Sequence, residues 1–328
     1  MNPLESWLAK RWDSAQHRKA AFLRIADSLS PPLRKFAKRL MWPRSLRHMR
    51  YLAPGIALRP MSSQSWEVFE RDSILAASTP LHQFLQVLDG PVSIVATGPT
   101  ALDYPWDALQ TNRRFIIAVN GATTMLKNLG LTPDLHVVTD RMFALTEMRH
   151  FEAATEVPLA IDYLAAAALA SSAPRVLAKR QFAILERVNT WFGLPVLDDK
   201  SLREMNERSG KPFVLPGIPQ TKGYVGWSHR PELGVFSGRT VVYAALQLAV
   251  GAGAKDVEII GMDLSGAGRA YDERGNPRPT QLQQHYQQFI LPSFEMMHRA
   301  LQGSQVKIRC LSPVCPLPSR LFAPISKQ

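Results

Sequence analysis

Cysteine and long apolar runs are scarce in this sequence of 328 residues. The two cysteines, Cys310 and Cys315, are too few for a disulfide framework or a cysteine-based metal site, which fits a reducing cytosolic compartment. No stretch reaches the ~18–20 consecutive apolar residues that a membrane-spanning helix needs. The N-terminus interleaves tryptophans with Lys10 and Arg11, which differs from the order of a signal peptide. We therefore expect neither a spanning helix nor a disulfide-linked fold.

Nucleotide-binding fingerprints and metal-ligand spacings are also missing from the sequence. It contains neither the glycine pattern of a dinucleotide site nor a P-loop. Asp198 and Asp199 are adjacent, which differs from the spaced acid pair that would hold a nucleotide-sugar through a metal ion. His285 and His298 lack partners at ligand spacing, and His298 fits a packing role in a helix. We expect no metal ion and no cofactor.

Acidic residues are rare in the first sixty residues, which makes this segment strongly basic. The chain has a net charge of +12, from 39 Lys and Arg against 27 Asp and Glu. Residues 1–60 hold thirteen of the basic residues and three acids, a net charge of +10. The remaining 26 basic and 24 acidic residues leave the rest nearly neutral. We interpret residues 1–60 as a basic arm and residues 61–328 as a single α/β domain.

The basic arm has the pattern of two amphipathic helices. Residues 3–29 and 33–41 combine an apolar stripe with a basic one, and proline ends each segment. Such helices, with tryptophans near their ends, are typical of binding to an anionic membrane surface, where each Lys or Arg contributes on the order of 1 kcal/mol. Packing of the arm on the domain is an alternative, and nucleic-acid binding is a weaker one because no such motif is present. We expect residues 1–50 to bind an anionic membrane surface and expect no nucleic-acid partner.

Three short apolar runs in residues 92–141 predict neighbouring strands of a parallel sheet. Residues 93–96, 115–119 and 135–138 are apolar and largely β-branched, and each run ends in a turn of small or polar residues. Ligands of such sheets bind outside the carboxyl ends of the strands. The three turns should therefore converge on one site, in an α/β, Rossmann-like, mostly parallel sheet with helices on both faces.

The alternation of strands and helices continues toward the C-terminus. We expect helices around 80–88, 163–170, 241–251 and 280–301, the last interrupted or ended near Pro292, and strands over 158–161, 181–185, 257–262 and 306–311. Residues 62–90 are interpreted as a short lead-in. Residues 198–235 are rich in Gly, Pro and charge, and we interpret them as a structureless stretch and a candidate lid over the site.

The turns after the first two predicted strands are candidates for ligand binding. Gly98 lets the backbone approach a ligand closely, and Thr97 and Thr100 add hydroxyl groups, which suits a phosphate or a ribose. Asn120 can bind a ligand or can simply form a turn with Gly121, since Asn-Gly is a common turn pair.

Two aspartates and a histidine are candidates for acid–base chemistry. Asp140 and Asp263 each follow an apolar strand, where a buried charge needs a partner, and each can act as a general base, bind a hydroxyl group or cap a helix. His285 follows a polar loop and can reach the strand ends. Tyr271 begins part of that loop, over residues 271–276, and adjoins the predicted site.

Blocks of residues from Val92 to Pro313 match one known family in order and at similar spacing. They are Gly98-Pro99-Thr100, Ile117-Ala118-Val119-Asn120-Gly121, Thr139-Asp140, Phe143, Lys222-Gly223, Val225-Gly226, Thr240, Ala244-Ala245, Gly261-Met262-Asp263-Leu264-Ser265-Gly266, Tyr271-Asp272-Glu273, Gly275-Asn276 and Leu311-Ser312-Pro313. The chain resembles the WaaZ-type transferases of 3-deoxy-D-manno-octulosonic acid (Kdo) to the lipopolysaccharide core. The blocks are more distantly similar to the CMP-sialic-acid-dependent bacterial sialyltransferases of family 42. Residues 1–60 lie outside the resemblance.

The resemblance implies a metal-independent glycosyltransferase with a variant of the GT-A fold, which moves Kdo from CMP-Kdo to the lipopolysaccharide inner core. By likeness to the sialyltransferases, the residues that would hold CMP are Gly98, Pro99, Thr100 and Asn120, and those that would contact phosphate or sugar are Thr240 with Ser265 or Tyr271. Gly121 and Arg141 adjoin these turns and complete the predicted substrate-binding set. The sialyltransferases place a histidine base shortly after a His-Tyr pair, whereas His285-Tyr286 is followed by Gln287 here. The identity of the base therefore stays open among His285, Asp140 and Asp263.

We interpret the protein as a peripheral enzyme at the cytoplasmic face of the inner membrane, which transfers Kdo or a related ulosonic acid by an inverting displacement. Its expected partners are CMP-Kdo and a lipopolysaccharide core acceptor. Two other classes stay open, a nucleotide-dependent pyrophosphokinase-like enzyme and a non-catalytic, membrane-associated lipopolysaccharide assembly protein.

Overall fold

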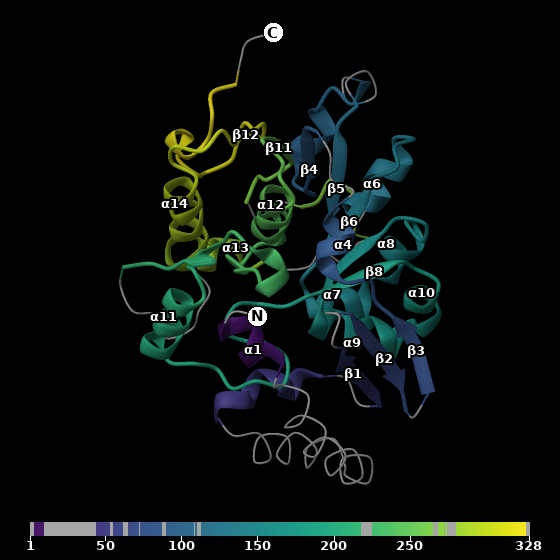
Figure 1. The fold of residues 1–328 in the computed structure, drawn as a ribbon. Helices are drawn as coiled ribbons and strands as arrows, with labels where there is room; N and C mark the ends of the chain where they lie inside the picture. Colours follow the sequence, from purple (N-terminus) through teal and green to yellow (C-terminus); the bar gives the residue numbers. More distant parts are fainter. Residues whose placement is uncertain are drawn as a thin grey trace.

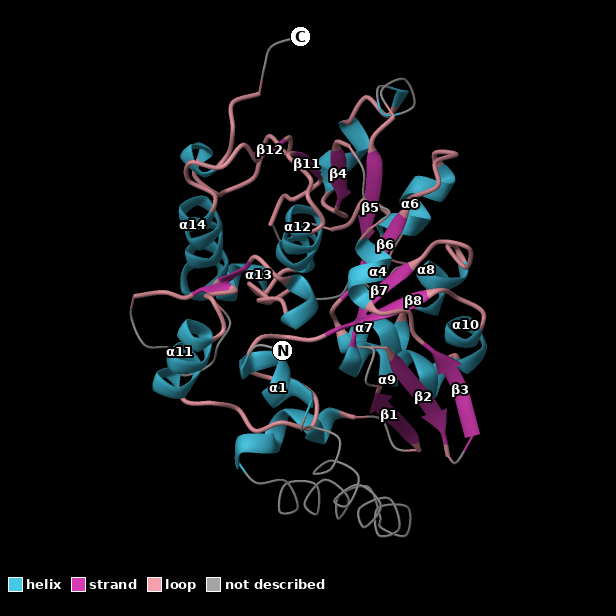
Figure 2. Cartoon of the chain, in the orientation of Figure 1, coloured by secondary structure: helices cyan, strands magenta, loops and turns pink. Residues whose placement is uncertain are grey.

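A seven-stranded parallel sheet forms the centre of the computed structural model (Figures 1 and 2). The structure describes residues 3–9, 44–52, 55–61, 65–71, 73–86, 90–107, 109, 113–217, 225–264, 268–271, 273 and 280–325. The strand order is β12-β11-β4-β5-β6-β7-β8, and every neighbouring pair is parallel. The strands are β4 (Val92–Val95), β5 (Phe115–Val119), β6 (Leu135–Val138), β7 (Leu159–Asp162), β8 (Phe182–Leu185), β11 (Asp256–Ile260) and β12 (Lys307–Cys310). This confirms the predicted fold class.

Helices cover both faces of the sheet, which explains why its strands are apolar along their length. One core joins the sheet to α4 (Leu81–Leu85), α12 (Val241–Gly251) and α14 (Leu291–Ala300). The cores on the other face include α6 (Ala122–Asn128), α7 (Arg141–Thr146), α9 (Tyr163–Ser172) and α10 (Pro174–Ala178). α8 (Met148–Glu152) packs against α6. The predicted helices at 80–88, 163–170 and 241–251 are confirmed, although α4 is shorter than expected.

The interruption expected near Pro292 is also present. α13 (Leu282–His285) continues as a π-helical turn, Tyr286–Ile290, which leads directly into α14. Pro292 lies in the first turn of α14, directly after the π-helical turn, and it has no backbone N–H to donate to the preceding turn of this continuous helix.

A three-stranded antiparallel sheet precedes the central sheet, although we predicted no strand in this part of the sequence. Its strands are β1 (Ile56–Pro60), β2 (Trp66–Glu70) and β3 (Ser73–Ala77). Buried and partly exposed residues alternate along β1 and β2, because one face of this sheet packs on α9. β1 falls inside residues 1–60, the range predicted as the arm, and pairs with β2, which falls in the range predicted as the α/β domain. The predicted boundary at residue 60 therefore divides this sheet.

The first helix, α1 (Pro3–Ala9), packs on the domain. Leu4 and Leu8 are buried, and the Leu4 N–H donates a 3.0 Å hydrogen bond to Ser209 Oγ. Trp7 meets Trp191 edge to face, with ring centroids 5.3 Å apart. This matches the packed alternative for residues 3–9, whereas residues 10–43, with the rest of both predicted arm helices, lie outside the described residues. Within the described chain, no helix is long and apolar enough to cross a bilayer.

Residues 198–235 are not a structureless stretch, so that part of the prediction is wrong. They contain α11 (Asp199–Arg208), the paired short strands β9 (Phe213–Val214) and β10 (Trp227–Ser228), and a 3-10 turn, Pro231–Leu233. Trp227 is fully buried in the main core. Residues 218–224 lie outside the described residues. A lid function for this segment stays a prediction.

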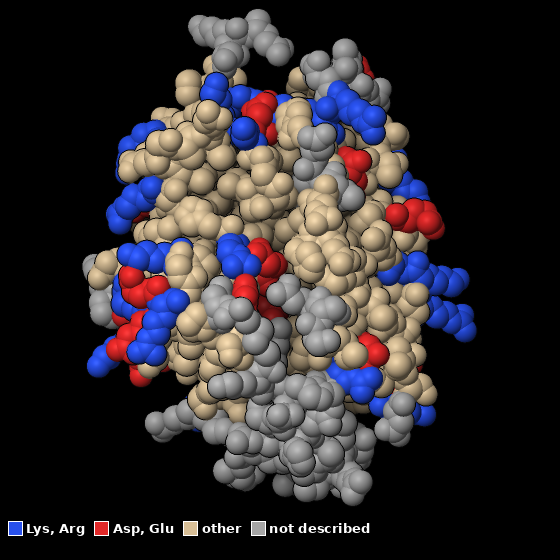
Figure 3. Space-filling model, in the orientation of Figure 1, with Lys and Arg blue, Asp and Glu red and all other residues tan. Residues whose placement is uncertain are grey.

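Charged residues are unevenly placed on the surface. On the face drawn in Figure 3, Lys and Arg gather along the margins, and uncharged residues cover most of the middle.

Candidate active site

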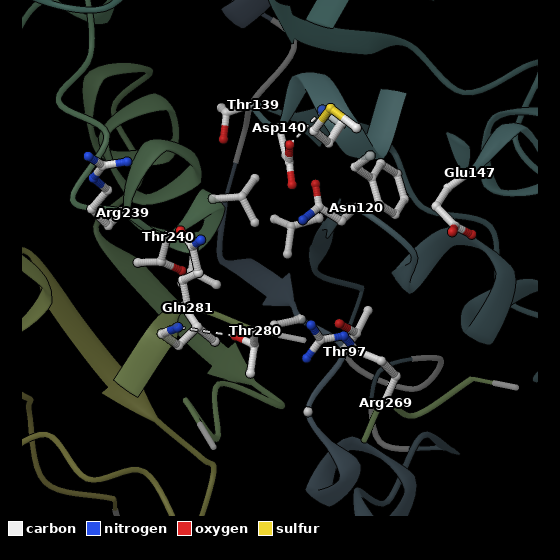
Figure 4. Close-up of a pocket in the computed structure, with 18 of the residues that line it drawn as sticks. Thr97, Asn120, Thr139, Asp140, Glu147, Arg239, Thr240, Arg269, Thr280 and Gln281 are labelled. Atoms are coloured by element: carbon white, nitrogen blue, oxygen red, sulfur yellow. Dashed lines mark hydrogen bonds between the residues drawn. The ribbon is translucent and has the colours of Figure 1, made fainter. Parts of the chain in front are cut away.

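A cavity of about 790 Å³ lies at the carboxyl ends of the central strands (Figure 4). Residues from the turns after β4, β5, β6 and β11 line it, together with the start of α12 and residues near α13. The predicted convergence of the strand-end turns is confirmed. The predicted site residues that line the cavity are Gly98, Asn120, Asp140, Arg141, Thr240, Asp263, Tyr271 and His285. Pro99, Thr100 and Gly121 do not line the cavity, and Ser265 lies outside the described residues.

The turns after β4 and β11 are fastened to each other. The Gly98 N–H donates a 2.8 Å hydrogen bond to the Gly261 carbonyl, and a β-carbon on Gly98 would lie 2.5 Å from both that oxygen and the Asp263 carboxylate. Asp263 accepts hydrogen bonds at both oxygens from Thr100, at 2.9 Å from the N–H and a shorter one from the hydroxyl. Gly98 is therefore needed for contact between two turns, and Asp263 caps the 3-10 turn Pro99–Asp103.

Asn120 presents an unsatisfied polar atom in the cavity wall. Its backbone is left-handed, with φ +48°, and its side chain lies beside Asp140 in Figure 4. The Oδ1 atom is buried and accepts no hydrogen bond from the residues that the structure describes. Since a buried carbonyl oxygen without a partner is costly, a hydrogen-bond donor on a ligand is the natural complement to it.

The backbone of Asn120 is held from behind by His136, a fully buried residue of β6. His136 Nε2 donates to the Asn120 carbonyl at 2.7 Å, and Nδ1 lies 3.3 Å from Arg180 Nη2. Burial, and then the nearby Arg180 guanidinium, hold the pKa of His136 well below its usual value. His136 is therefore neutral, with its proton on Nε2 and its Nδ1 accepting from Arg180.

Gly121 makes room for Tyr271 instead of facing the cavity. A β-carbon at Gly121 would lie 2.3 Å from the Tyr271 ring. That ring meets His150 edge to face at 4.5 Å between centroids, and the Arg149 guanidinium lies 5.5 Å from its centre. Burial raises the pKa of Tyr271 above its usual value. Tyr271 lines the cavity, and its hydroxyl group is neutral and can donate or accept a hydrogen bond there.

Asp140 and Arg141 stand at the start of α7. Asp140 caps the helix, with Oδ1 accepting from the Met142 N–H at 2.7 Å, and the side chain is exposed to the cavity. Figure 4 shows its carboxylate directed inward. The Arg141 guanidinium lies 5.8 Å from the centre of the Tyr51 ring at the rim of the cavity. One oxygen of Asp140 serves the cap, and the other faces the space where a ligand would lie.

Positive charge enters the cavity from two further elements. Arg239 and Thr240 precede α12, whose first N–H groups point toward the cavity with the positive end of the helix dipole. Arg269 extends inward from the segment after β11, and Figure 4 shows its guanidinium directed toward Thr280. These arginines were missed in the sequence, because nothing near Arg239 or Arg269 marks them as cavity residues.

His285 lines the cavity at the end of α13. Its Nε2 lies 3.2 Å from Gln281 Oε1, and its ring packs against Phe289. Burial, and then the Arg239 guanidinium, lower its pKa below the usual value. A neutral histidine can accept a proton, so the geometry leaves His285 available as a base.

Backbone strain is concentrated in this wall. Six described residues other than glycine have positive φ, and Asn120, Arg239 and Leu264 are three of them, at +48°, +58° and +51°. Each such residue costs roughly 1–3 kcal/mol and tends to persist where the surrounding structure positions a functional group. Among the described residues, no cluster of His, Cys, Asp and Glu could hold a metal ion.

Comparison with known proteins shows which family this chain resembles. A family model described as 3-deoxy-D-manno-octulosonic acid transferase WaaZ matches residues 86–318. The chain is 28% identical over 214 residues to the probable 3-deoxy-manno-octulosonic acid transferase of Escherichia coli (strain K12), covering 63% of this chain and 73% of that protein. The match to the family model includes the turns after β4, β5, β6 and β11.

Two solved structures also show similarity to this chain. One is MAf glycosyltransferase from Magnetospirillum magneticum AMB-1, with a TM-score of 0.37, 16% identity and coverage of 74% of this chain and 38% of that one. The other is the sialyltransferase CST-II in complex with a trisaccharide acceptor and CMP, with a TM-score of 0.36, 13% identity and coverage of 73% and 89%. The chain thus spans well under half the length of the MAf protein. Since the family model covers most of the sequence, the chain belongs to the 3-deoxy-D-manno-octulosonic acid transferase WaaZ family of glycosyltransferases.

Proposed function

We propose that this protein transfers Kdo, or a related 3-deoxy-ulosonic acid, from its CMP-activated form to the lipopolysaccharide core by a metal-independent, inverting displacement. Family membership supports Kdo as the sugar and its transfer to an acceptor as the reaction. The cavity of about 790 Å³ is within the range that holds small ligands.

The observation that carries the proposal is the unsatisfied Oδ1 of Asn120. A cytosine amino group or a ribose hydroxyl group is a donor of the kind that this acceptor needs. A nucleotide bound there would extend between Asn120 and the arginines at the other walls. We assign the nucleoside to the Asn120 side of the cavity.

The phosphate and the ulosonate carboxylate would lie near Arg239, Arg269 and the start of α12. Two guanidinium groups and a helix N-terminus favour negative charge, and they would stabilise the CMP that leaves. Thr240 and Tyr271 add hydroxyl groups near this position. The two arginines and the start of α12 thus supply the positive charge at this position.

Asp140 is the base that we favour, because its carboxylate faces the cavity and keeps one oxygen outside the helix cap. It would take the proton of the acceptor hydroxyl as that oxygen bonds to the anomeric carbon of the ulosonic acid. The bond from this carbon to the phosphate oxygen then breaks, and CMP leaves with the bonding electrons. His285 is the second candidate. Asp263 is the third, because Thr100 engages both of its oxygens.

We further propose that the enzyme acts as a peripheral protein on the cytoplasmic face of the inner membrane, where its lipid-linked acceptor would lie. The net charge of +10 on residues 1–60 supports attraction to anionic lipid.

The test is to incubate the purified protein with CMP-Kdo and lipopolysaccharide from cells that lack the gene. We expect stoichiometric release of CMP and an increase in the acceptor mass by one Kdo residue. Mass gain with inverted anomeric configuration, unchanged by a chelator, would support the mechanism. In a parallel incubation with ATP, formation of AMP by pyrophosphoryl transfer, with no CMP release from CMP-Kdo, would point instead to a pyrophosphokinase-like enzyme. Lipopolysaccharide of unchanged mass would contradict the proposal.

A further inference from the structure

One rim of the cavity is apolar and exposed. Met142 and Leu145 on α7 are 47% and 37% exposed, and Tyr51 is 44% exposed. Met142 and Tyr51 also line the cavity. Because residues three apart on a helix lie on the same side, Met142 and Leu145 form an apolar edge that begins at the mouth of the cavity with Met142 and continues one turn along α7 to Leu145, which does not itself line the cavity.

The outward apolar side of α7 has no role in the core of the domain. The helix already buries Phe143 and Ala144 on its inner side, where it packs against α9. Isolated exposed hydrophobic residues are normal on a protein surface. Apolar residues gathered at the mouth of a binding cavity instead indicate contact with an apolar partner, such as a lipid bilayer or another protein.

Positive charge accompanies this edge. Arg47 is exposed on the 3-10 helix Arg44–Tyr51, and Arg141 lies against Tyr51. In sequence, residues 10–43 hold nine Lys and Arg against two acids. Both flanks of that basic segment are anchored in the domain, through Leu4 and Leu8 before it and through Leu46 and Met49 after it. The basic segment therefore connects directly to an element whose last residue forms the cavity rim.

An apolar edge, an amphipathic tyrosine and neighbouring arginines match the composition of a surface that enters the headgroup region of an anionic bilayer. We propose that Tyr51, Met142 and Leu145 form a membrane-facing rim, through which the cavity opens onto an anionic lipid surface. This inference rests on the proposed function, since it explains how a lipid-linked acceptor would reach Asp140 without leaving the bilayer. It goes beyond the basic arm, because it fixes which side of the domain faces the lipid.

The sharpest test compares two leucines of matched exposure. Leu145 is 37% exposed at the rim, and Leu129 is 39% exposed at the end of α6. The chain enters β6 after Leu129, so this residue lies near the amino edge of the sheet, away from the cavity. In the full-length protein carrying Cys310→Ser and Cys315→Ser, Leu145→Cys or Leu129→Cys provides one site for an environment-sensitive fluorophore.

With vesicles of phosphatidylcholine and phosphatidylglycerol, the label at position 145 should brighten and should be quenched by brominated acyl chains. The label at 129 should respond to neither. Equal responses at the two positions, or no response at 145 from protein that sediments with the vesicles, would overturn the proposal. Protein that does not sediment with the vesicles at all would overturn it too, and would leave a protein partner as the occupant of the rim.

Transferase activity provides a second test of the rim. Leu145→Asp should reduce turnover of a vesicle-embedded acceptor at least about threefold, with turnover of a lipid-free acceptor unchanged, while Leu129→Asp should change neither. Equal turnover of the embedded acceptor by the two variants would contradict the rim. If the wild-type protein releases no CMP from CMP-Kdo with either acceptor, the proposed function fails, and the fluorescence result still decides the orientation on the membrane.

Discussion

His136 Nε2 donates a 2.7 Å hydrogen bond to the backbone carbonyl of Asn120, so a buried strand residue sets the position of a residue in the cavity wall. Behind it, Arg180 holds the other imidazole nitrogen and donates to the Val157 carbonyl. Burial lowers the pKa of Arg180 to about 9. The left-handed backbone of Asn120 is therefore supported from the interior of the sheet, and not by the ligand.

We expect His136→Phe to raise the KM for the CMP donor about tenfold with a smaller change in kcat, because the loss of a buried donor costs roughly 1–3 kcal/mol and displaces Asn120. Steady-state kinetics at several donor concentrations would measure this. His136→Gln, whose amide can donate to the same carbonyl, should recover most of the KM. A thermal unfolding scan separates misfolding from misplacement, and a folded His136→Phe protein with unchanged KM would exclude the positioning role.

Asn120→Gly should weaken binding of CMP and of cytidine by a similar factor, about tenfold, because it removes the amide that faces the nucleoside. Glycine tolerates the φ of +48° at this position, so the substitution should leave the free energy of unfolding nearly unchanged. Isothermal titration calorimetry with both ligands would measure the two affinities. Wild-type affinity for cytidine in the variant would show that Asn120 does not contact the nucleoside.

Arg269→Gln should weaken binding of CMP about tenfold and leave binding of cytidine unchanged, because the guanidinium is proposed to contact the phosphate, which cytidine lacks. The measured quantity is the ratio of the two affinities, which cancels general damage to the site. Arg299→Gln is a matched control, since Arg299 is exposed on α14 and does not line the cavity. An equal loss for both ligands would place Arg269 away from the phosphate.

The central sheet was predictable because its strands are buried on both faces, which demands continuous apolar runs such as residues 115–119. β1 and β2 were missed because half-buried strands show only alternation, and Arg59, Pro60 and Glu67 weaken that signal. The helix α11 was missed for a related reason. It buries little besides Leu202 and Asn206, so its sequence reads as a polar loop.

In the cavity, the strand-end turns were predictable because strand order determines which turns meet. Asp140 and Asn120 follow from that rule. Arg239 and Arg269 do not, because their place depends on how distant segments fold over the sheet. His136 could have been noticed, since a histidine inside an apolar strand needs a buried partner.

The protein should lose stability as the pH falls from about 6.5 toward 4, partly through His48. Burial lowers the pKa of His48 from its usual 6.5 to about 4, against the opposing effect of its hydrogen bond to the Trp191 carbonyl at 3.0 Å. Nδ1 is buried without a described partner, so protonation there is costly. The stabilisation from a neutral His48 is therefore complete above pH 6.5 and falls by up to about 3 kcal/mol near pH 4.

Urea unfolding at several pH values would measure this dependence. His48→Gln retains a donor for Trp191 and cannot titrate, so its stability should change less with pH between 6.5 and 4. His136 should contribute in the same direction, because its pKa is also lowered. Identical slopes for the wild type and His48→Gln would rule out His48 as a source of the acid sensitivity.

Asp140→Asn should lower kcat about 10²- to 10⁴-fold, because an amide cannot take the proton of the acceptor hydroxyl. Its side-chain oxygen can still accept from the Met142 N–H, so the cap and the unfolding temperature should be nearly unchanged. Stopped assays of CMP release, with thermal unfolding of the same samples, would measure both effects.

Asp263→Asn is the variant to compare with Asp140→Asn. Its carboxylate accepts both hydrogen bonds from Thr100, and an amide has only one acceptor oxygen, so this change should lower the free energy of unfolding by about 1–2 kcal/mol. Since the two substitutions remove the same charge, the pattern identifies the base. If Asp263→Asn abolishes turnover with normal stability while Asp140→Asn remains active, Asp263 is the base and Asp140 is only a helix cap. Loss of turnover in His285→Asn alone would assign that role to His285.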